Sequence, residues 1–141
     1  IPNAVSSRGG VSMLQGVTII DKDGEQADFD VIFMQVQTNF GSADSASTIT
    51  DGNLQASKVI GCLNIDWDDA DIIFAQDSGN ATIFSATGPV ANASAHQLPL
   101  LVQAAEGETS IYFTAIVNTT DNADWAATDD LEFVFHFQYL G

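Results

Sequence analysis

Basic residues are almost absent from this chain. Lys and Arg together number 3, at Arg8, Lys22 and Lys58, against 19 acidic residues, and the formal net charge is −16 over 141 residues. Affinity for nucleic acid and for anionic membranes depends on Lys and Arg side chains that displace counterions. We therefore expect neither nucleic acid nor a membrane as a partner. The acidic surface favours a soluble protein with little casual self-association.

Cysteine, proline and long apolar runs are also scarce. Cys62 is the only cysteine, so a disulfide framework and a thiolate metal cluster are both excluded, and we expect Cys62 to serve as a small buried hydrophobe. No apolar run has the length of a membrane span, and no signal peptide is visible. Because the chain begins with Ile1 rather than Met, a leader or a few residues can precede it.

What the chain has in quantity is short apolar segments, separated by Gly, Asp, Asn and Ser. Their lengths and punctuation predict strands. The eight segments are VSMLQGVTII, FDVIFMQVQ, VIGCLNI, IIFA, ATIFSA, LPLLVQAA, SIYFTAIV and LEFVFHFQYL. About eight strands in one domain predict an all-β fold, a β-sandwich of jelly-roll-like form. We expect residues 1–10 to be a flexible arm and residues 11–141 to be the single sandwich domain.

Two segments allow a more detailed prediction. LEFVFHFQYL alternates strictly, with Leu131, Phe133, Phe135, Phe137 and Tyr139 on one face, which indicates a strand with one apolar side. TDGNLQASKVIG predicts the one short helix, with Thr50 or Asp51 as its N-cap and Gly61 as its terminator.

An acidic run, DKDGEQADFD, lies between the first two predicted strands. A helix-flanked calcium loop that starts at Asp21 needs Gly at its sixth position and Glu at its twelfth, but the chain has Gln26 and Ile32 there. Asp-Gly between two strand patterns is a turn signal, because Gly readily adopts positive φ. We therefore predict a hairpin turn here, with adventitious cation binding as the lesser alternative.

The remaining candidate sites have weak signals. Asp66, Asp68, Asp69 and Asp71 surround Trp67 and could hold a hard cation, although a solvated loop with a buried Trp67 is the simpler reading. Trp125 lies in a second acidic loop and could anchor that loop or contact another protein. His96 and His136 form no zinc or nucleophile constellation; we expect His96 at the surface and His136 partly buried in its strand. We predict no catalytic residue, metal or cofactor.

The order of several short motifs resembles a known family. GVTIIDKDGEQADFDVIFMQVQTNFGSADSASTITD, then ASKVIGCLNI and later AAEGETSIYFTAIV, are similar to small structural proteins of tailed bacteriophages, over roughly Gly16 to Val117. The resemblance implies a virion component, such as a capsid cement or decoration protein on the outer surface of the head. It carries no catalytic residues to this chain.

The expected partners follow from that resemblance. They are the major capsid protein and copies of this chain, with a homotrimer favoured by the local threefold axes of a shell. The candidate contact residues are Val5, Arg8, Trp67 and Trp125. Two other functions remain open, a tail or head-fibre component and a carbohydrate-binding sandwich module.

Overall fold

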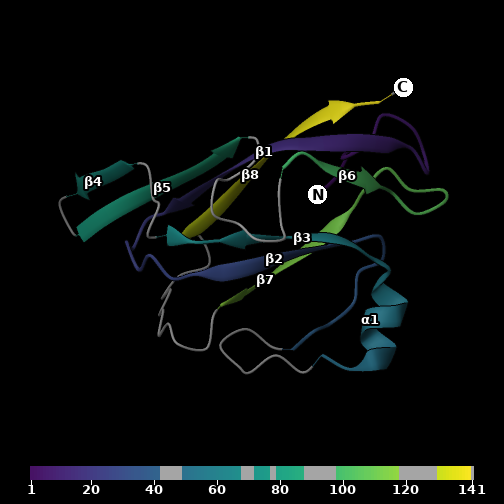
Figure 1. Cartoon of the computed structure of the whole chain (residues 1–141), viewed down its shortest axis with the longest axis horizontal. Coiled ribbons are helices and arrows are strands. Elements are labelled where there is room, and N and C mark those ends of the chain that lie inside the picture. The colour runs from purple at the N-terminus through teal and green to yellow at the C-terminus, as the bar shows by residue number, and fades with distance from the viewer. Residues whose placement is uncertain (42–48, 68–71, 77–78, 88–97, 118–129, 141) are drawn as a thin grey trace.

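The computed structural model describes residues 1–41, 49–67, 72–76, 79–87, 98–117 and 130–140. These residues form one helix and eight strands (Figure 1). The elements are β1 (Val11–Asp21), β2 (Phe29–Met34), α1 (Asp51–Ser57), β3 (Val59–Ile65), β4 (Ile72–Gln76), β5 (Gly79–Thr87), β6 (Leu100–Gln103), β7 (Tyr112–Val117) and β8 (Leu131–Tyr139). Each of the eight predicted strand segments overlaps one of these strands, so the all-β prediction is confirmed.

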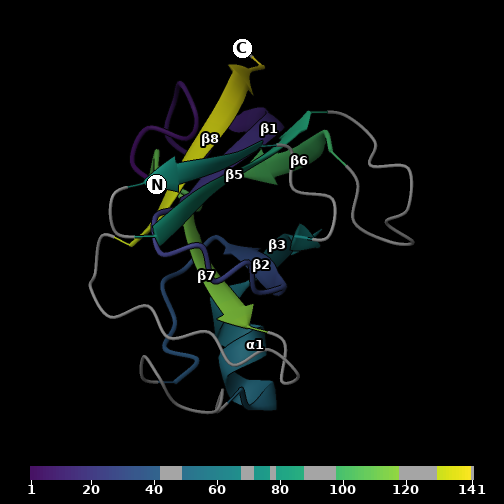
Figure 2. The ribbon, with the colours of Figure 1, turned by 90° about the vertical axis from the view of Figure 1, so that its left-hand side faces the viewer.

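The strands form two antiparallel sheets that lie as two layers (Figures 1 and 2). In sheet A, β1 lies between β8 on one side and β5 and β6 on the other, and β4 extends the sheet beyond β5. In sheet B, β2 lies between β3 and β7. The first two strands thus pair with the last two, β1 with β8 and β2 with β7. Of the described strands, five belong to sheet A and three to sheet B.

The core lies between the two layers. Alternate residues of β1 and β2 point into it, because successive side chains of a strand face opposite sides. The fully buried positions include Leu14, Val17, Ile19, Phe29, Val31 and Phe33. Both strands are central in their sheets.

The predicted hairpin between β1 and β2 is wrong. Within the described ranges, β1 pairs only with strands of sheet A, and β2 pairs only with β3 and β7, so residues 22–28 cross from one layer to the other. Gly24 does adopt a positive φ of 69°. The Asp-Gly signal therefore located a turn correctly, but a local turn signal does not say which strands pair.

Asp21 holds this crossing in place. Its side chain is fully buried. One carboxylate oxygen, Oδ1, accepts hydrogen bonds from the backbone N–H groups of Asp23 at 3.2 Å and Gly24 at 3.0 Å, and Oδ2 accepts one from Gln26 at 2.9 Å. At the far end, Asp28 Oδ1 accepts a hydrogen bond from the Trp67 backbone N–H at 2.9 Å. These carboxylates therefore replace backbone partners at a sheet-to-sheet corner.

The short helix forms where it was predicted. Thr50 is its N-cap, and the Thr50 hydroxyl accepts a hydrogen bond from the Asn53 backbone N–H at 3.2 Å. The helix ends at Lys58, which adopts a left-handed conformation with φ 50°, so the prediction of Gly61 as terminator is wrong. Gly61 lies within β3. A Cβ atom there would come within 2.7 Å of Leu100 Cδ1, so this glycine permits close approach between β3 and β6.

Residues 1–10 differ from the flexible arm that we expected. Ala4 and Val5 are buried in the core, and the Val5 N–H donates to the Thr109 carbonyl at 3.3 Å. Ser12 Oγ also donates a hydrogen bond to the Ala4 carbonyl at 2.5 Å. Buried apolar side chains and backbone hydrogen bonds together dock this Ser- and Gly-rich stretch. In the described part of the chain, no helix is long and apolar enough to cross a membrane.

Candidate functional site

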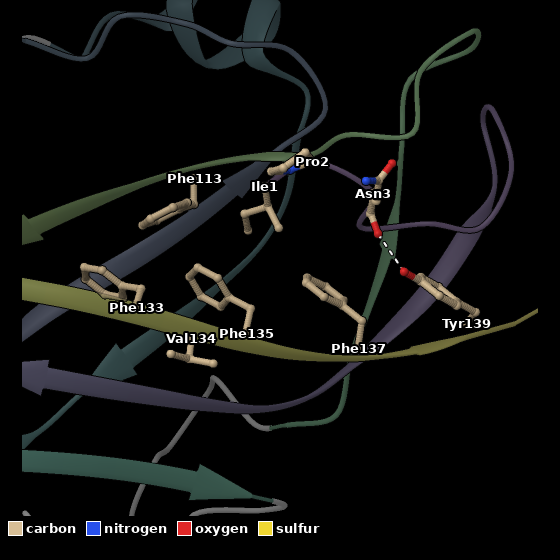
Figure 3. A pocket seen from close by; sticks show the side chains of 9 residues that line it. All are labelled: Ile1, Pro2, Asn3, Phe113, Phe133, Val134, Phe135, Phe137 and Tyr139. Carbon is tan, nitrogen blue, oxygen red and sulfur yellow. Dashed lines mark hydrogen bonds between the residues drawn. The ribbon is translucent and has the colours of Figure 1, made fainter.

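The side of the sandwich between β7 and β8 is open. Among the described strands, β7 pairs only with β2, and β8 pairs only with β1, so each is the edge of its sheet. Between these two edges lies an apolar groove with a volume of about 680 Å³, which we call the edge groove (Figure 3). Its lining residues are Ile1, Pro2, Asn3, Phe113, Phe133, Val134, Phe135, Phe137 and Tyr139.

Aromatic rings form the floor of the edge groove. The ring centroid of Phe113 on β7 lies 4.9 Å from that of Phe135 and 5.2 Å from that of Phe133, both on β8. Phe33 lies behind them, with its centroid 5.5 Å from that of Phe135. Most of these pairs are tilted or edge-to-face, which is the favourable geometry for aromatic pairs. The rings therefore form one closely packed aromatic surface.

The rings of β8 are only partly covered. Phe133, Phe135 and Phe137 are half-buried, whereas Phe29 and Phe33 on the central strand of sheet B are 1% and 0% exposed. All five side chains point between the sheets, so the difference comes from position in the sheet. An edge strand has no neighbour to cover its outer flank, and part of each ring remains open to solvent.

The N-terminal segment forms one end of the groove (Figure 3). The Ile1 nitrogen donates to the Ile111 carbonyl at 2.8 Å, and the Ile111 N–H donates to the Ile1 carbonyl at 3.2 Å. The Tyr139 hydroxyl donates to the Asn3 carbonyl at 2.9 Å. These bonds connect the first residues to Ile111, which directly precedes β7, and to Tyr139 on β8, so the segment bridges the two sheets at this end.

The side chains that line the groove are mostly apolar. Its side chains are apolar or aromatic apart from the amide of Asn3 and the hydroxyl of Tyr139. Across the described ranges, no group of three or more His, Cys, Asp or Glu side chains converges to hold a metal ion. An aromatic surface of this kind suits contact with another protein.

The structure separates the candidate contact residues from one another. Val5 is 2% exposed and Trp67 is 3% exposed, and both belong to the hydrophobic core. Arg8 is exposed. Trp125 lies outside the described residues. An interface residue must be accessible to its partner. Of the three candidates that the structure describes, Arg8 alone meets this condition. The edge groove, which contains none of the four, was missed.

The histidines and the aspartates around Trp67 were the other candidates from the sequence. His136 is exposed on the outer face of β8, so the prediction that it is partly buried is wrong, and its Nε2 lies 3.3 Å from Thr18 Oγ1. His96, Asp68, Asp69 and Asp71 lie outside the described residues. The prediction that Trp67 is buried in its loop is confirmed.

Cys62 lies on β3 and is partly buried rather than fully buried. Burial, and secondarily the negative charge of Asp30, raise the pKa of the Cys62 thiol. Asp30 is on the adjacent strand, where it accepts a hydrogen bond from the Asn64 side chain at 3.0 Å. A raised pKa disfavours the nucleophilic thiolate. This agrees with the structural role expected for Cys62.

Comparison of the chain with protein-family models, with curated proteins and with solved structures finds no match.

Proposed function

We propose that this chain is a structural virion protein, a capsid cement or decoration protein that binds the outer surface of a tailed-bacteriophage head and stabilises the shell. The observation that carries the proposal is the edge groove between β7 and β8. A half-exposed aromatic surface without charged or nucleophilic side chains is suited to protein contact rather than to chemistry. The ordered resemblance of Gly16 to Val117 to small phage structural proteins points in the same direction.

The charge supports a position on the outside of the shell. A net charge of −16 would be repelled by packaged DNA, whereas the outer surface of a head places it in solvent. In this proposal, the partners are the major capsid protein and copies of the same chain.

The mechanism is thermodynamic linkage. A protein that binds only the assembled shell stabilises it by RT ln(1 + [L]/Kd), which is about 2.7 kcal/mol per site when the free protein is at a hundredfold excess over Kd. Repeated over many sites, this contribution raises the resistance of the shell to heat and internal pressure.

The test compares heads made with and without this chain. We expect it to occupy heads in a fixed ratio to the major capsid protein, measured by quantitative mass spectrometry. Heads that lack it should release their DNA at a lower temperature, and added purified protein should restore the original temperature. Location at the tail, or only a few copies per particle, would contradict cementing and favour the tail or head-fibre alternative.

The carbohydrate-binding alternative depends on an exposed tryptophan near acidic residues. Trp67 is buried, which removes one of the two candidates, and Trp125 lies outside the described residues. A glycan screen with and without a chelator tests this alternative directly, and calcium-dependent binding to a sugar would favour it over the virion proposal.

A further inference from the structure

The outer edge of β8 lacks the features that keep edge strands apart. Natural proteins protect exposed edges with Lys, Pro, bulges, short strands or inward-pointing charges. β8 is 9 residues long, contains neither Lys nor Pro, and has Glu132 as its single acidic residue. The register shift in the β1–β8 ladder comes from an extra residue on β1, so β8 itself is regular. In a chain with 19 acids, this edge is nearly free of charge.

The hydrogen bonds of the β1–β8 ladder show which backbone groups are available. The Leu140 N–H donates to the Val11 carbonyl, and the Asp130 carbonyl accepts from the Lys22 N–H. Even-numbered residues of β8 therefore direct their backbone groups to β1. Because these directions alternate along a strand, the odd-numbered residues direct their N–H and C=O groups to the open edge. Four of these odd-numbered residues line the edge groove, namely Phe133, Phe135, Phe137 and Tyr139.

We propose that two copies of this chain pair through the open edges of their β8 strands, antiparallel about a twofold axis at Phe135. Phe135 then faces its own copy, Phe133 faces Phe137, and Leu131 faces Tyr139. These pairs all use backbone groups that point to the open edge, so each can exchange two hydrogen bonds. The two five-stranded sheets would become one continuous sheet, and the two edge grooves would face each other across the axis.

Charge favours this register. Residues directly opposite each other lie on the same face of an antiparallel pair, and like charges there are destabilising. A twofold axis at Phe135 places Glu132 opposite the neutral Gln138 of the other copy, and Val134 opposite His136. The only acid of the strand thus avoids its own copy. Val134, 38% exposed, and Tyr139, 53% exposed, would both lose solvent contact.

We favour a second copy of this chain, rather than a basic protein, as the partner of the β8 edge. A basic protein would need acidic side chains to bind, and β8 has only Glu132. The remaining acids of the two copies repel each other, and salt screens that repulsion. The dimer should therefore tighten as sodium chloride is raised, whereas a complex with a basic protein would weaken. The inference concerns the protein in solution and is independent of the shell partner proposed above.

The first experiment is sedimentation equilibrium of the purified full chain over a range of concentrations and salt. We expect a monomer–dimer equilibrium. Gln138→Glu should weaken the dimer about fivefold, because it places two acid pairs opposite each other, and Gln138→Lys should tighten it by a similar factor. Gln37→Glu and Gln37→Lys make the same charge changes at an exposed residue away from β8 and serve as matched controls. Circular dichroism verifies that each variant is folded.

The second experiment tests the register by cross-linking. Even-numbered residues form the non-hydrogen-bonded pairs between copies, where Cα atoms lie about 4.5 Å apart, a distance that a disulfide can span. In a Cys62→Ser background, Val134→Cys with His136→Cys should give a covalent dimer under mild oxidation. Val134→Cys alone should give little, because its opposite residue is His136.

Several results would overturn the proposal. They are a monomer at all concentrations and salt conditions, a trimer, or a dimer that neither responds to the Gln138 variants nor cross-links through positions 134 and 136. A trimer would instead favour the ring expected from shell symmetry. None of these results bears on whether the chain is found on heads, so this inference and the proposed function can fail separately.

Discussion

Asp21 shows how a carboxylate that resembles a metal ligand can instead support the backbone. Its two oxygens accept three backbone hydrogen bonds from residues 23–26, and the side chain is buried. Removing a charged acceptor leaves buried donors unsatisfied.

We expect Asp21→Asn to lower the free energy of unfolding by about 2 kcal/mol, because it replaces one acceptor oxygen by an NH₂ group and removes the charge that strengthens the remaining bonds. Urea denaturation followed by circular dichroism measures the change. Glu25→Gln is the matched control, since it removes the same charge from an exposed residue in the same segment and should change stability little. Equal effects of the two substitutions would contradict this role for Asp21.

Cys62 gives a prediction about pH. Burial and Asp30 raise the pKa of its thiol, so the folded protein favours the protonated form. The rate of alkylation by iodoacetamide should therefore rise with pH around a midpoint above that of free cysteine. The stability of the fold should change in the opposite direction, since the contribution of the neutral thiol is present below the unfolded-state pKa and is lost as pH rises through the folded-state pKa.

The pH midpoint of the alkylation rate distinguishes a raised thiol pKa from simple steric protection. Steric protection slows alkylation at every pH and leaves the midpoint unchanged. Asp30→Asn should lower the midpoint part of the way, because it removes the secondary, electrostatic cause and keeps an oxygen for Asn64. Unfolding in urea should return it to the value of free cysteine. A folded-state midpoint at or below that value would show that the thiol is not stabilised in its protonated form.

Helix α1 is short enough for its cap to matter. Thr50→Ala removes the acceptor for the Asn53 N–H and should destabilise the protein by about 1 kcal/mol, whereas Thr50→Ser retains the hydroxyl and should preserve most of the stability. Thermal unfolding of the three proteins measures both effects. If Ser and Ala behave alike, the hydroxyl contributes nothing as a cap.

The elements themselves were readable from the sequence, and their partners were not. The period-two pattern of LEFVFHFQYL predicts β8 and its Phe face, because alternation is a local property. Whether that strand is central or at an edge depends on pairing with β1, more than a hundred residues away along the chain. For the same reason, the Asp-Gly turn after Asp21 gave a correct bend and an incorrect hairpin.

The edge groove shows both what the sequence predicts and what it does not. Its Phe residues are visible in the sequence as core positions, and they are indeed on the inner face. Their partial exposure follows from the two edge strands meeting on one side, which no local pattern reports. Val5 shows the opposite case, since a short apolar pair within a polar stretch gives too weak a signal to predict docking.

For the whole molecule, the acidic surface and the nearly uncharged β8 edge have opposite effects on association. Charge repulsion acts over roughly a Debye length, about 8 Å at physiological ionic strength, whereas strand pairing acts at contact. This combination would limit casual aggregation while permitting one aligned contact between copies. It also makes salt concentration the variable to control in any study of assembly.

The bond between Tyr139 and Asn3 also has a practical consequence for labelling. It holds Asn3 against the end of β8, at one corner of the sandwich beside the β8 edge. A bulky fusion at either end would shield that corner, so affinity tags on this protein should be small or cleavable.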